Sequence, residues 1–404
     1  MKLKQIPEDF RVTELCDVTP GSGGSFAFYK LTKRNIGTPE AIREICQRWK
    51  LTPRQVSYGG LKDRHAITEQ YLSIQHGQRD NLKAKAWQLH YLGQISQPYH
   101  STDFHGNEFA VVLRDLNKRE ISRIKLQLEQ AVSAGVPNYY DEQRFRSMGR
   151  GKAFIARHLI AGDFEAALRL AIAEPYAYDR KDEKEQKRIL QAHWGDWSWL
   201  LIQFKHGPTR RVIQHLNHAP TDFRGAFTRL PHELQSLYLS AYQSHLWNRI
   251  LGKWLLDCIK NDHRLAIHLN GEALPMPKKW PPEADIPHTM ALPLPSARLH
   301  LDAQDPMLPY YEQVMREEGL SMADMKIKDL REPFFSKGAR HVLFFPKSLT
   351  WTKEADELHP GQRKLSLRFQ LPRGSYATMF IKRITEAKPH RFIVNAARPS
   401  TLSD

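Results

Sequence analysis

Hydrophobic and polar residues alternate in short stretches at both ends of the chain. The pattern covers residues 10–14, 26–31 and 109–113 in the first part, and it returns at 341–345 and 365–371 near the C-terminus. Alternation over a few residues is typical of a strand with one buried face, whereas strands of a fully buried parallel sheet form continuous apolar runs. The two ends of the chain therefore predict an α+β domain with a mixed, mainly antiparallel sheet.

In the middle of the chain, the apolar residues change to helical spacing. Helices are predicted over 153–173, 178–192 and 236–259, and the last of these has an apolar stripe along one face. Seven prolines between residues 275 and 295 interrupt any regular pattern. We therefore expect a mostly helical middle region that contains an irregular segment.

The length and charge of the chain add two expectations. At 404 residues it exceeds what one hydrophobic core usually supports. We therefore predict a domain built from residues 1–154 and 339–404, with a mostly helical domain inserted at 155–338. The formal net charge of +16 indicates a polyanionic partner, most commonly nucleic acid. A merely basic soluble enzyme is the alternative.

The cysteines and histidines argue against a disulfide or metal framework. Cys16, Cys46 and Cys258 lie far apart and form no C-x-x-C pair, which favours a reducing cytosol. His215 and His218 lack a third ligand at suitable spacing, so we expect no metal site. No window approaches the roughly 20 apolar residues of a membrane span, and the N-terminus lacks a signal peptide. A cytoplasmic protein without membrane contact is predicted.

Two glycine-rich segments separate predicted strands. We expect residues 21–25 to form a hairpin loop between the first two strands, because they lack the Gly-Lys-Ser/Thr ending of a phosphate-binding loop. Residues 59–60 supply the freedom for a sharp bend. This bend carries Lys62-Asp63-Arg64 between a brief strand at 56–58 and a strand at 68–76.

Asp63 is the candidate catalytic residue of this bend. An aspartate in a glycine-rich turn most often caps nearby backbone amides. Lys62 and Arg64, however, flank Asp63 and can hold its carboxylate ionised, and a loop tip can present it to a ligand. The residues alone leave both interpretations open.

Five segments, in this order, resemble the TruD family of pseudouridine synthases. They are Pro7-Glu8-Asp9-Phe10-Arg11-Val12-Thr13-Glu14, the run from Gly60 to Ser73, Pro137-Asn138-Tyr139-Tyr140-Asp141-Glu142-Gln143-Arg144-Phe145, Leu239-Ser240-Ala241-Tyr242-Gln243-Ser244-His245-Leu246-Trp247-Asn248, and Leu371-Pro372-Arg373-Gly374-Ser375-Tyr376-Ala377-Thr378. They span nearly the whole chain, so the resemblance is more specific than a lone Lys-Asp-Arg triplet. Tyr140 and Tyr376 stand where the family usually has phenylalanine, which keeps a stacking face and adds a hydroxyl.

The resemblance implies isomerisation of a uridine in RNA to pseudouridine, typically at position 13 of tRNA. It implies a pseudouridine synthase catalytic domain with a TruD-specific insertion, no cofactor, and Asp63 as the catalytic residue. Asp63 would act as a nucleophile or remove a sugar proton, and the sequence does not choose between these routes. The implied substrate-binding residues are Lys4, Phe10, Lys62, Arg64, Asn138, Tyr140 and Tyr376.

Basic residues beside two of these segments predict contacts with the RNA backbone. They are Lys33 and Arg34 in the first part of the chain, and Arg144 and Arg150 in the middle. We expect a monomer whose partner is RNA, in the first place tRNA. The rival hypothesis is an RNA-binding or chaperone protein that has the same fold and no turnover.

Overall fold

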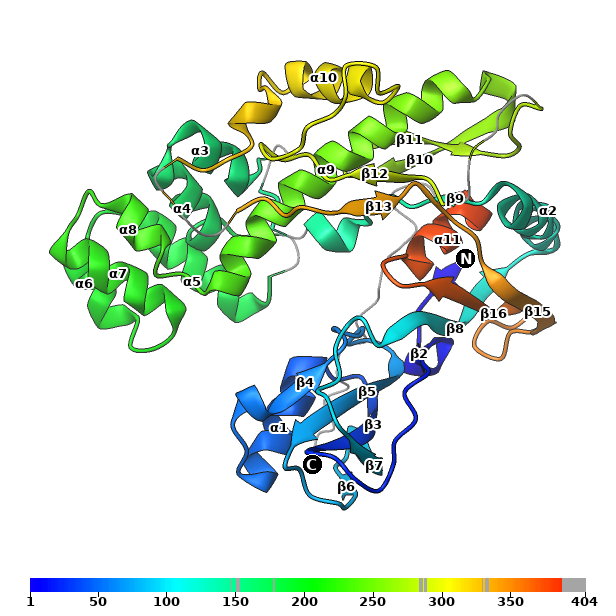
Figure 1. Cartoon of the computed structure of the whole chain (residues 1–404), viewed down its shortest axis with the longest axis horizontal. Coiled ribbons are helices and arrows are strands. Elements are labelled where there is room, and N and C mark those ends of the chain that lie inside the picture. The colour runs from blue at the N-terminus through cyan, green and yellow to red at the C-terminus, as the bar shows by residue number, and fades with distance from the viewer. Residues whose placement is uncertain are drawn as a thin grey trace. The chain divides into compact units, whose positions relative to one another are not determined.

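The computed structural model describes residues 1–145, 147–149, 153–176, 179–282, 286, 289–328, 330 and 334–386 (Figure 1). They form two compact units. The first unit contains residues 1–136 and the described residues from 344 onward, and the second contains residues 137–343. The boundaries expected at 154/155 and 338/339, and the assignment of the middle region as a TruD-specific insertion, stay predictions.

The first unit is built on a ten-stranded sheet with the order β15-β16-β8-β2-β5-β3-β7-β6, in which β1 also pairs with β8 and β4 with β5. The strands are β1 (Lys2–Leu3), β2 (Phe10–Cys16), β3 (Phe26–Arg34), β4 (Val56–Tyr58), β5 (Ile67–Gln75), β6 (Leu82–Lys83), β7 (Trp87–Ile95), β8 (Phe104–Leu116), β15 (Lys347–Ala355) and β16 (Arg363–Pro372). β2 and β5 run parallel, and the other pairs in this sheet are antiparallel. Because β16 pairs along β8, both chain ends build one sheet, and the predicted α+β fold is confirmed.

The alternating apolar residues form the core of this unit. Every second residue of β16, from Leu365 to Leu371, is buried, as are Phe109, Val111 and Leu113 of β8. α2 (Lys118–Ala134) and α11 (Ala377–Thr385) pack against each other near these strands (Figure 1). At the other end of the sheet, α1 (Thr38–Trp49) joins a buried cluster with apolar residues of β3 and β5.

The hairpin predicted at residues 21–25 is wrong. These residues connect β2 to β3, but the two strands do not pair, because β5 lies between them. The connection runs from residue 17 to residue 25, which is long enough to pass one strand. A glycine-rich sequence specifies a reversal of the chain, but it does not specify which strand becomes the neighbour.

The second unit is mostly helical, as predicted for the middle of the chain. Its helices are α3 (Ile155–Ala161), α4 (Phe164–Ile172), α5 (Lys181–Ala192), α6 (Trp197–Gln203), α7 (Pro208–His218), α8 (Phe223–Phe227), α9 (His232–Cys258) and α10 (Leu308–Glu317). The single helix predicted at 153–173 is two helices, because Gly162 is left-handed (φ 79°) and Asp163 caps α4. No helix in the described part of the chain is long and apolar enough to cross a membrane.

In the described part of the chain, short strands outside this sheet form three further pairs. β10 (Arg264–Leu269) pairs with β11 (Glu272–Pro277), β12 (Ala291–Pro293) with β13 (Ala339–His341), and β9 (Val136–Pro137) with β14 (Leu343–Phe344). The proline-rich stretch is therefore not wholly irregular, since β11 and β12 both lie in it. Proline is tolerated there because each strand has a free edge in a two-stranded pair.

Candidate active site

Asp63 lies in the loop between β4 and β5, where its side chain is 26% exposed. Three buried side chains hold the backbone of this loop. Gln70 of β5 donates from Nε2 to the Gly60 carbonyl (3.1 Å), and Thr38 of α1 accepts from the Lys62 amide (3.1 Å). Thr38 in turn donates to Gln70 (2.8 Å), so the two residues act together. The third side chain is Lys33, whose Nζ is 2.7 Å from the Asp63 carbonyl oxygen.

Lys4 is the cation that contacts the Asp63 carboxylate. Its Nζ lies 3.0 Å from Asp63 Oδ2, and 3.8 Å from the centre of the Phe10 ring. The Lys4 side chain is almost buried, and Phe10 is fully buried beneath it. A close ammonium favours the ionised form of a carboxylate, so this pair keeps a charged carboxylate at the loop. The Phe10 ring is covered and cannot stack on a base in this conformation, so its predicted role in substrate binding is corrected. We assign Phe10 instead to holding the Lys4 ammonium in place.

The segment that carries Lys4 is held by a buried carboxylate. Asp9 accepts hydrogen bonds at Oδ2 from the backbone amides of Gln5 (3.1 Å) and Ile6 (3.2 Å). Asp9 is itself paired with Arg114 of β8, whose Nε lies 2.9 Å from Asp9 Oδ1. Asp9 belongs to the first TruD-like segment, so the sequence marks it as a residue of interest. Arg114 lies in none of these segments, and the sequence alone does not single it out.

Arg114 joins the N-terminal segment to the loop between β15 and β16. It is 3% exposed, and it also contacts Asp356 Oδ1 (2.9 Å) and Glu357 Oε1 (3.0 Å). Hydrogen bonds from Arg114 and Lys364 lower the pKa of Glu357 to about 2. Burial opposes ionisation of Asp356, but hydrogen bonds from the Asp115 and Leu358 amides and from Arg114 outweigh it and lower the pKa of Asp356. Asp356 and Glu357 are therefore ionised at neutral pH.

Lys62 and Arg64 each form an ion pair with another carboxylate, and the expectation that they hold Asp63 ionised stays a prediction. Lys62 turns inward, where its Nζ lies 2.6 Å from Glu14 Oε2 and donates to Asn107 Oδ1 (2.6 Å). Arg64 forms its ion pair with Glu40 and stays half exposed. Burial keeps Lys62 away from a phosphate, whereas Arg64 remains available to one.

Lys33 and Arg34, the last two residues of β3, also differ in exposure: the first is buried and the second is exposed. Lys33 is 1% exposed, so the prediction that it contacts the RNA backbone is corrected: its ammonium lies under the Asp63 loop. Arg34 is exposed and pairs with Glu8 (2.6 Å). Consecutive side chains of a strand point to opposite faces of the sheet, which explains the different environments of the two residues.

A second group of predicted residues lies in the second unit. Asn138 accepts two hydrogen bonds from Arg340, at its carbonyl oxygen (2.6 Å) and at Oδ1 (2.7 Å). The Arg340 guanidinium is 4.1 Å from the centre of the Tyr140 ring. Asn248 of α9 binds both the amide and the carbonyl of Tyr140 (2.8 Å each). The structure adds Arg340 and Asn248 to the residues predicted for the site. Of the two, only Asn248 lies in a TruD-like segment, as the last residue of the fourth one.

The remaining predicted residues are also placed within single units. Arg144 stacks near the Tyr140 ring (5.6 Å) and donates to Ser244 (3.2 Å). Tyr376 lies in the first unit, directly before α11, and is partly exposed. Arg150 lies outside the described residues. Of the predicted pocket residues, Phe10 and Tyr376 lie in the first unit, and Asn138 and Tyr140 lie in the second.

Replacing Asn248 by alanine should destabilise the second unit. The change leaves two buried backbone groups of Tyr140 without their partner, which lowers the free energy of unfolding by about 2–4 kcal/mol. Urea denaturation would measure this. The control is Gln214→Ala, which removes an exposed side-chain amide on α7. It should change the free energy of unfolding by less than about 0.5 kcal/mol. An equally small effect for Asn248→Ala would contradict the proposed clamp on Tyr140.

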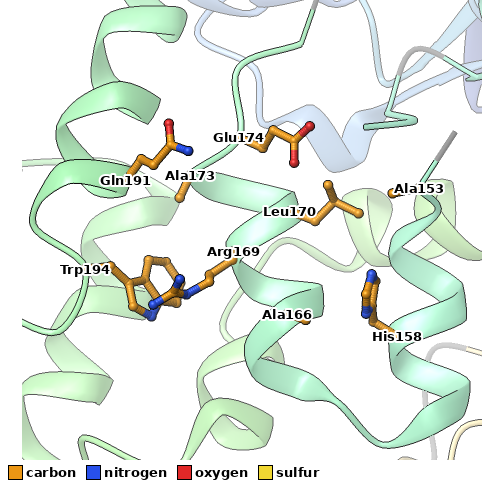
Figure 2. Close-up of a pocket in the computed structure, with 9 residues that line it drawn as sticks. All are labelled: Ala153, His158, Ala166, Arg169, Leu170, Ala173, Glu174, Gln191 and Trp194. Atoms are coloured by element: carbon orange, nitrogen blue, oxygen red, sulfur yellow. The ribbon is translucent and has the colours of Figure 1, made fainter. Parts of the chain in front are cut away.

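A cavity of about 270 Å³ lies among the helices α3, α4 and α5 (Figure 2). It is lined by Ala153, His158, Ala166, Arg169, Leu170, Ala173, Glu174, Gln191 and Trp194. Glu165 pairs with Arg169 (3.3 Å) and accepts from the Trp194 indole (3.0 Å), while His158 lies 3.8 Å from Asp163. Arg169 and His158 thus both lie beside carboxylates of the same region, and we assign no chemistry to this cavity. Among the described residues, no group of histidines, cysteines and carboxylates could hold a metal.

Comparison with known proteins places these features in a family. The family model described as tRNA pseudouridine synthase D (TruD) matches residues 1–278 and 284–384. A Methanocaldococcus jannaschii protein named "Probable tRNA pseudouridine synthase D 2" is 32% identical over 95% of this chain and 91% of that protein. The tRNA pseudouridine synthase D of Aquifex aeolicus is 26% identical over 95% of this chain and 98% of that protein.

A solved structure agrees with these sequence matches. A crystal structure assigned to tRNA pseudouridine synthase D (TruD) from Methanosarcina mazei superposes with a TM-score of 0.69 and 26% identity. The superposition covers 97% of this chain and 94% of that one. Sequence and fold therefore agree over nearly the full length, and the chain belongs to the TruD family of tRNA pseudouridine synthases.

Proposed function

We propose that the chain converts uridine 13 of tRNA to pseudouridine, with Asp63 as its catalytic carboxylate. As a member of the TruD family, the chain is a tRNA pseudouridine synthase that isomerises uridine in tRNA. The observation that supports Asp63 is its pairing with Lys4 at 3.0 Å on a loop whose backbone is held by buried side chains. A loop fixed in this way can present a charged carboxylate to a sugar without rearrangement.

Few groups are needed for the proposed chemistry. The target uridine must first leave the RNA stack, which costs a few kcal/mol. In the nucleophilic route, Asp63 attacks C1′ as the bond to N1 breaks, uracil turns, and C5 bonds to C1′ and displaces Asp63. N1 then gains a proton and C5 loses one, so the product is an isomer of the substrate. In the alternative route, Asp63 takes a sugar proton while uracil leaves, and returns it afterwards.

We assign the other residues according to their contacts. Lys4 is proposed to balance the negative charge of the Asp63 carboxylate when Asp63 is not bonded to the sugar. Asn138 and Tyr140 of the second unit are proposed to bind uracil, and Arg340 is added as the residue that fixes Asn138. Tyr376 of the first unit is proposed as a further substrate-binding residue. Arg34, Arg64 and Arg144 are proposed for phosphates of the RNA. A tRNA substrate fits the proposed cytoplasmic location, and a monomer stays our expectation.

Mapping pseudouridine on unmodified tRNA transcripts tests the position. Purified protein is incubated with a transcript that has uridine at position 13 and with a matched transcript that has cytidine there, followed by carbodiimide labelling and primer extension. We expect one stop, at position 13, in the first transcript only. A stop at another uridine would refute the position but not the activity. Tight binding without any stop would support the rival RNA-binding protein.

A further inference from the structure

A lysine ammonium lies buried under the candidate catalytic loop. Lys33, the penultimate residue of β3, is 1% exposed. Its Nζ donates to three backbone carbonyls: Ile36 (2.9 Å), Asp63 (2.7 Å) and Lys62 (3.3 Å). A lysine is rarely buried so completely, and an ammonium with three donors can satisfy three carbonyls. The carbonyls of the loop and the ammonium therefore depend on each other.

We propose that Lys33 is a positioning residue, which fixes the backbone of Asp63 and thereby aims its carboxylate at the substrate. The proposal rests on the proposed catalytic function of Asp63. Thr38 and Gln70 hold the loop at Lys62 and Gly60, on the N-terminal side of Asp63. Lys33 holds the catalytic residue itself, so the orientation of the carboxylate depends on this contact.

The protonation state of Lys33 makes the contact sensitive to pH. Burial lowers the pKa of Lys33 to about 8, although the nearby Asp63 and Glu40 carboxylates favour its charged form. Arg64 and Lys62 are the nearby cations, and they assist the lowering. Below pH 8 the charged side chain has three protons to donate, whereas above pH 8 the neutral amine has two. One of the three carbonyls then loses its donor.

Replacing Lys33 by methionine tests the positioning role at pH 7. A displacement of about 1 Å in a reacting group lowers a rate by about 100-fold, so kcat on tRNA should fall about 100-fold while KM changes by less than about threefold. The control is Lys85→Met, which removes an exposed lysine of the same unit and should leave both constants unchanged. A kcat within about threefold of wild type for Lys33→Met would overturn the proposal.

The pH profile separates positioning from a general loss of structure. The ratio of wild-type kcat to Lys33→Met kcat should fall several-fold between pH 7 and pH 9, because only the wild type has a Lys33 proton to lose. Ionisation of the substrate affects both proteins alike and cancels in the ratio. A ratio that stays constant with pH would contradict the proposal.

Hydrogen exchange gives a readout that does not depend on turnover. The amides of residues 59–66 should exchange faster in Lys33→Met than in wild type, while those of β16 should not change. If Lys33→Met does not fold, it is replaced by Lys33→Arg, which stays charged at every pH tested. The ratio of wild-type kcat to Lys33→Arg kcat should then fall as the pH rises above 8, because only the wild type loses a proton at residue 33. An active Asp63→Asn variant would refute the proposed function, whereas an inactive Asp63→Asn beside a normal Lys33→Met would refute only the role of Lys33.

Discussion

Replacing Asp63 by asparagine should abolish pseudouridine formation while the protein stays folded. Asparagine has the shape of aspartate, and its amide oxygen can still accept the hydrogen bond from Lys4. It cannot act as a carboxylate nucleophile or take a sugar proton. We therefore expect the single-turnover rate constant on tRNA to fall by about 10⁴-fold or more. This is the scale of the loss when a catalytic nucleophile is removed.

Binding distinguishes this result from a damaged site. The dissociation constant of Asp63→Asn for unmodified tRNA should equal that of the wild type or be slightly lower, because the change removes a negative charge that faces a polyanion. Asp17→Asn, an exposed aspartate of the same unit, is the control and should keep wild-type turnover. Turnover of Asp63→Asn within about tenfold of wild type would exclude Asp63 as the catalytic carboxylate.

The alternation of apolar residues was sufficient to predict the sheet, because a strand with one buried face repeats every two residues. Leu365 to Leu371 show this most clearly, since each alternate side chain enters the core. Strand order could not be predicted in the same way. The pairing of β5 between β2 and β3 depends on contacts between distant segments, and the loop at residues 21–25 contains no information about them.

In the candidate site, too, the residues of a local motif could be predicted, whereas contacts between residues far apart in the sequence could not. Asp63 was found through a local motif, and sequence neighbours suggested Lys62 and Arg64 as its partners. In the structure, Lys4 contacts Asp63 from 59 positions earlier in the chain. The sequence predicts a contact between Lys33 and the RNA backbone because Lys33 belongs to a basic cluster beside the TruD-like segments, and its burial follows from the face of β3 on which it lies. Arg340 lies in none of the TruD-like segments, so only the fold reveals it.

Replacing Arg114 by methionine should strongly destabilise the first unit. Asp9 and Asp356 are buried, and the change removes the guanidinium that both contact. Breaking a buried pair by removing one partner typically lowers stability by about 3–5 kcal/mol, which urea denaturation at pH 7 would measure. Arg123→Met, an exposed arginine on α2, should change stability by less than about 0.5 kcal/mol. A similarly small change for Arg114→Met would contradict the buried cluster.

The pH dependence of this variant provides a second, independent test. In the wild type, the pKa values of Asp356 and Glu357 are lowered, so their stabilising effect is complete above the unfolded pKa of about 4 and is lost as the pH falls through the lower folded values. In Arg114→Met, burial without a cation favours protonation of Asp356. Acid then relieves the variant above pH 4, where the wild type keeps its full stabilising effect, so their difference in stability should shrink between pH 7 and pH 4. A difference that stays constant over this range would show that Arg114 contributes packing and not charge, and would remove the electrostatic link between the β15–β16 loop and the segment that carries Lys4.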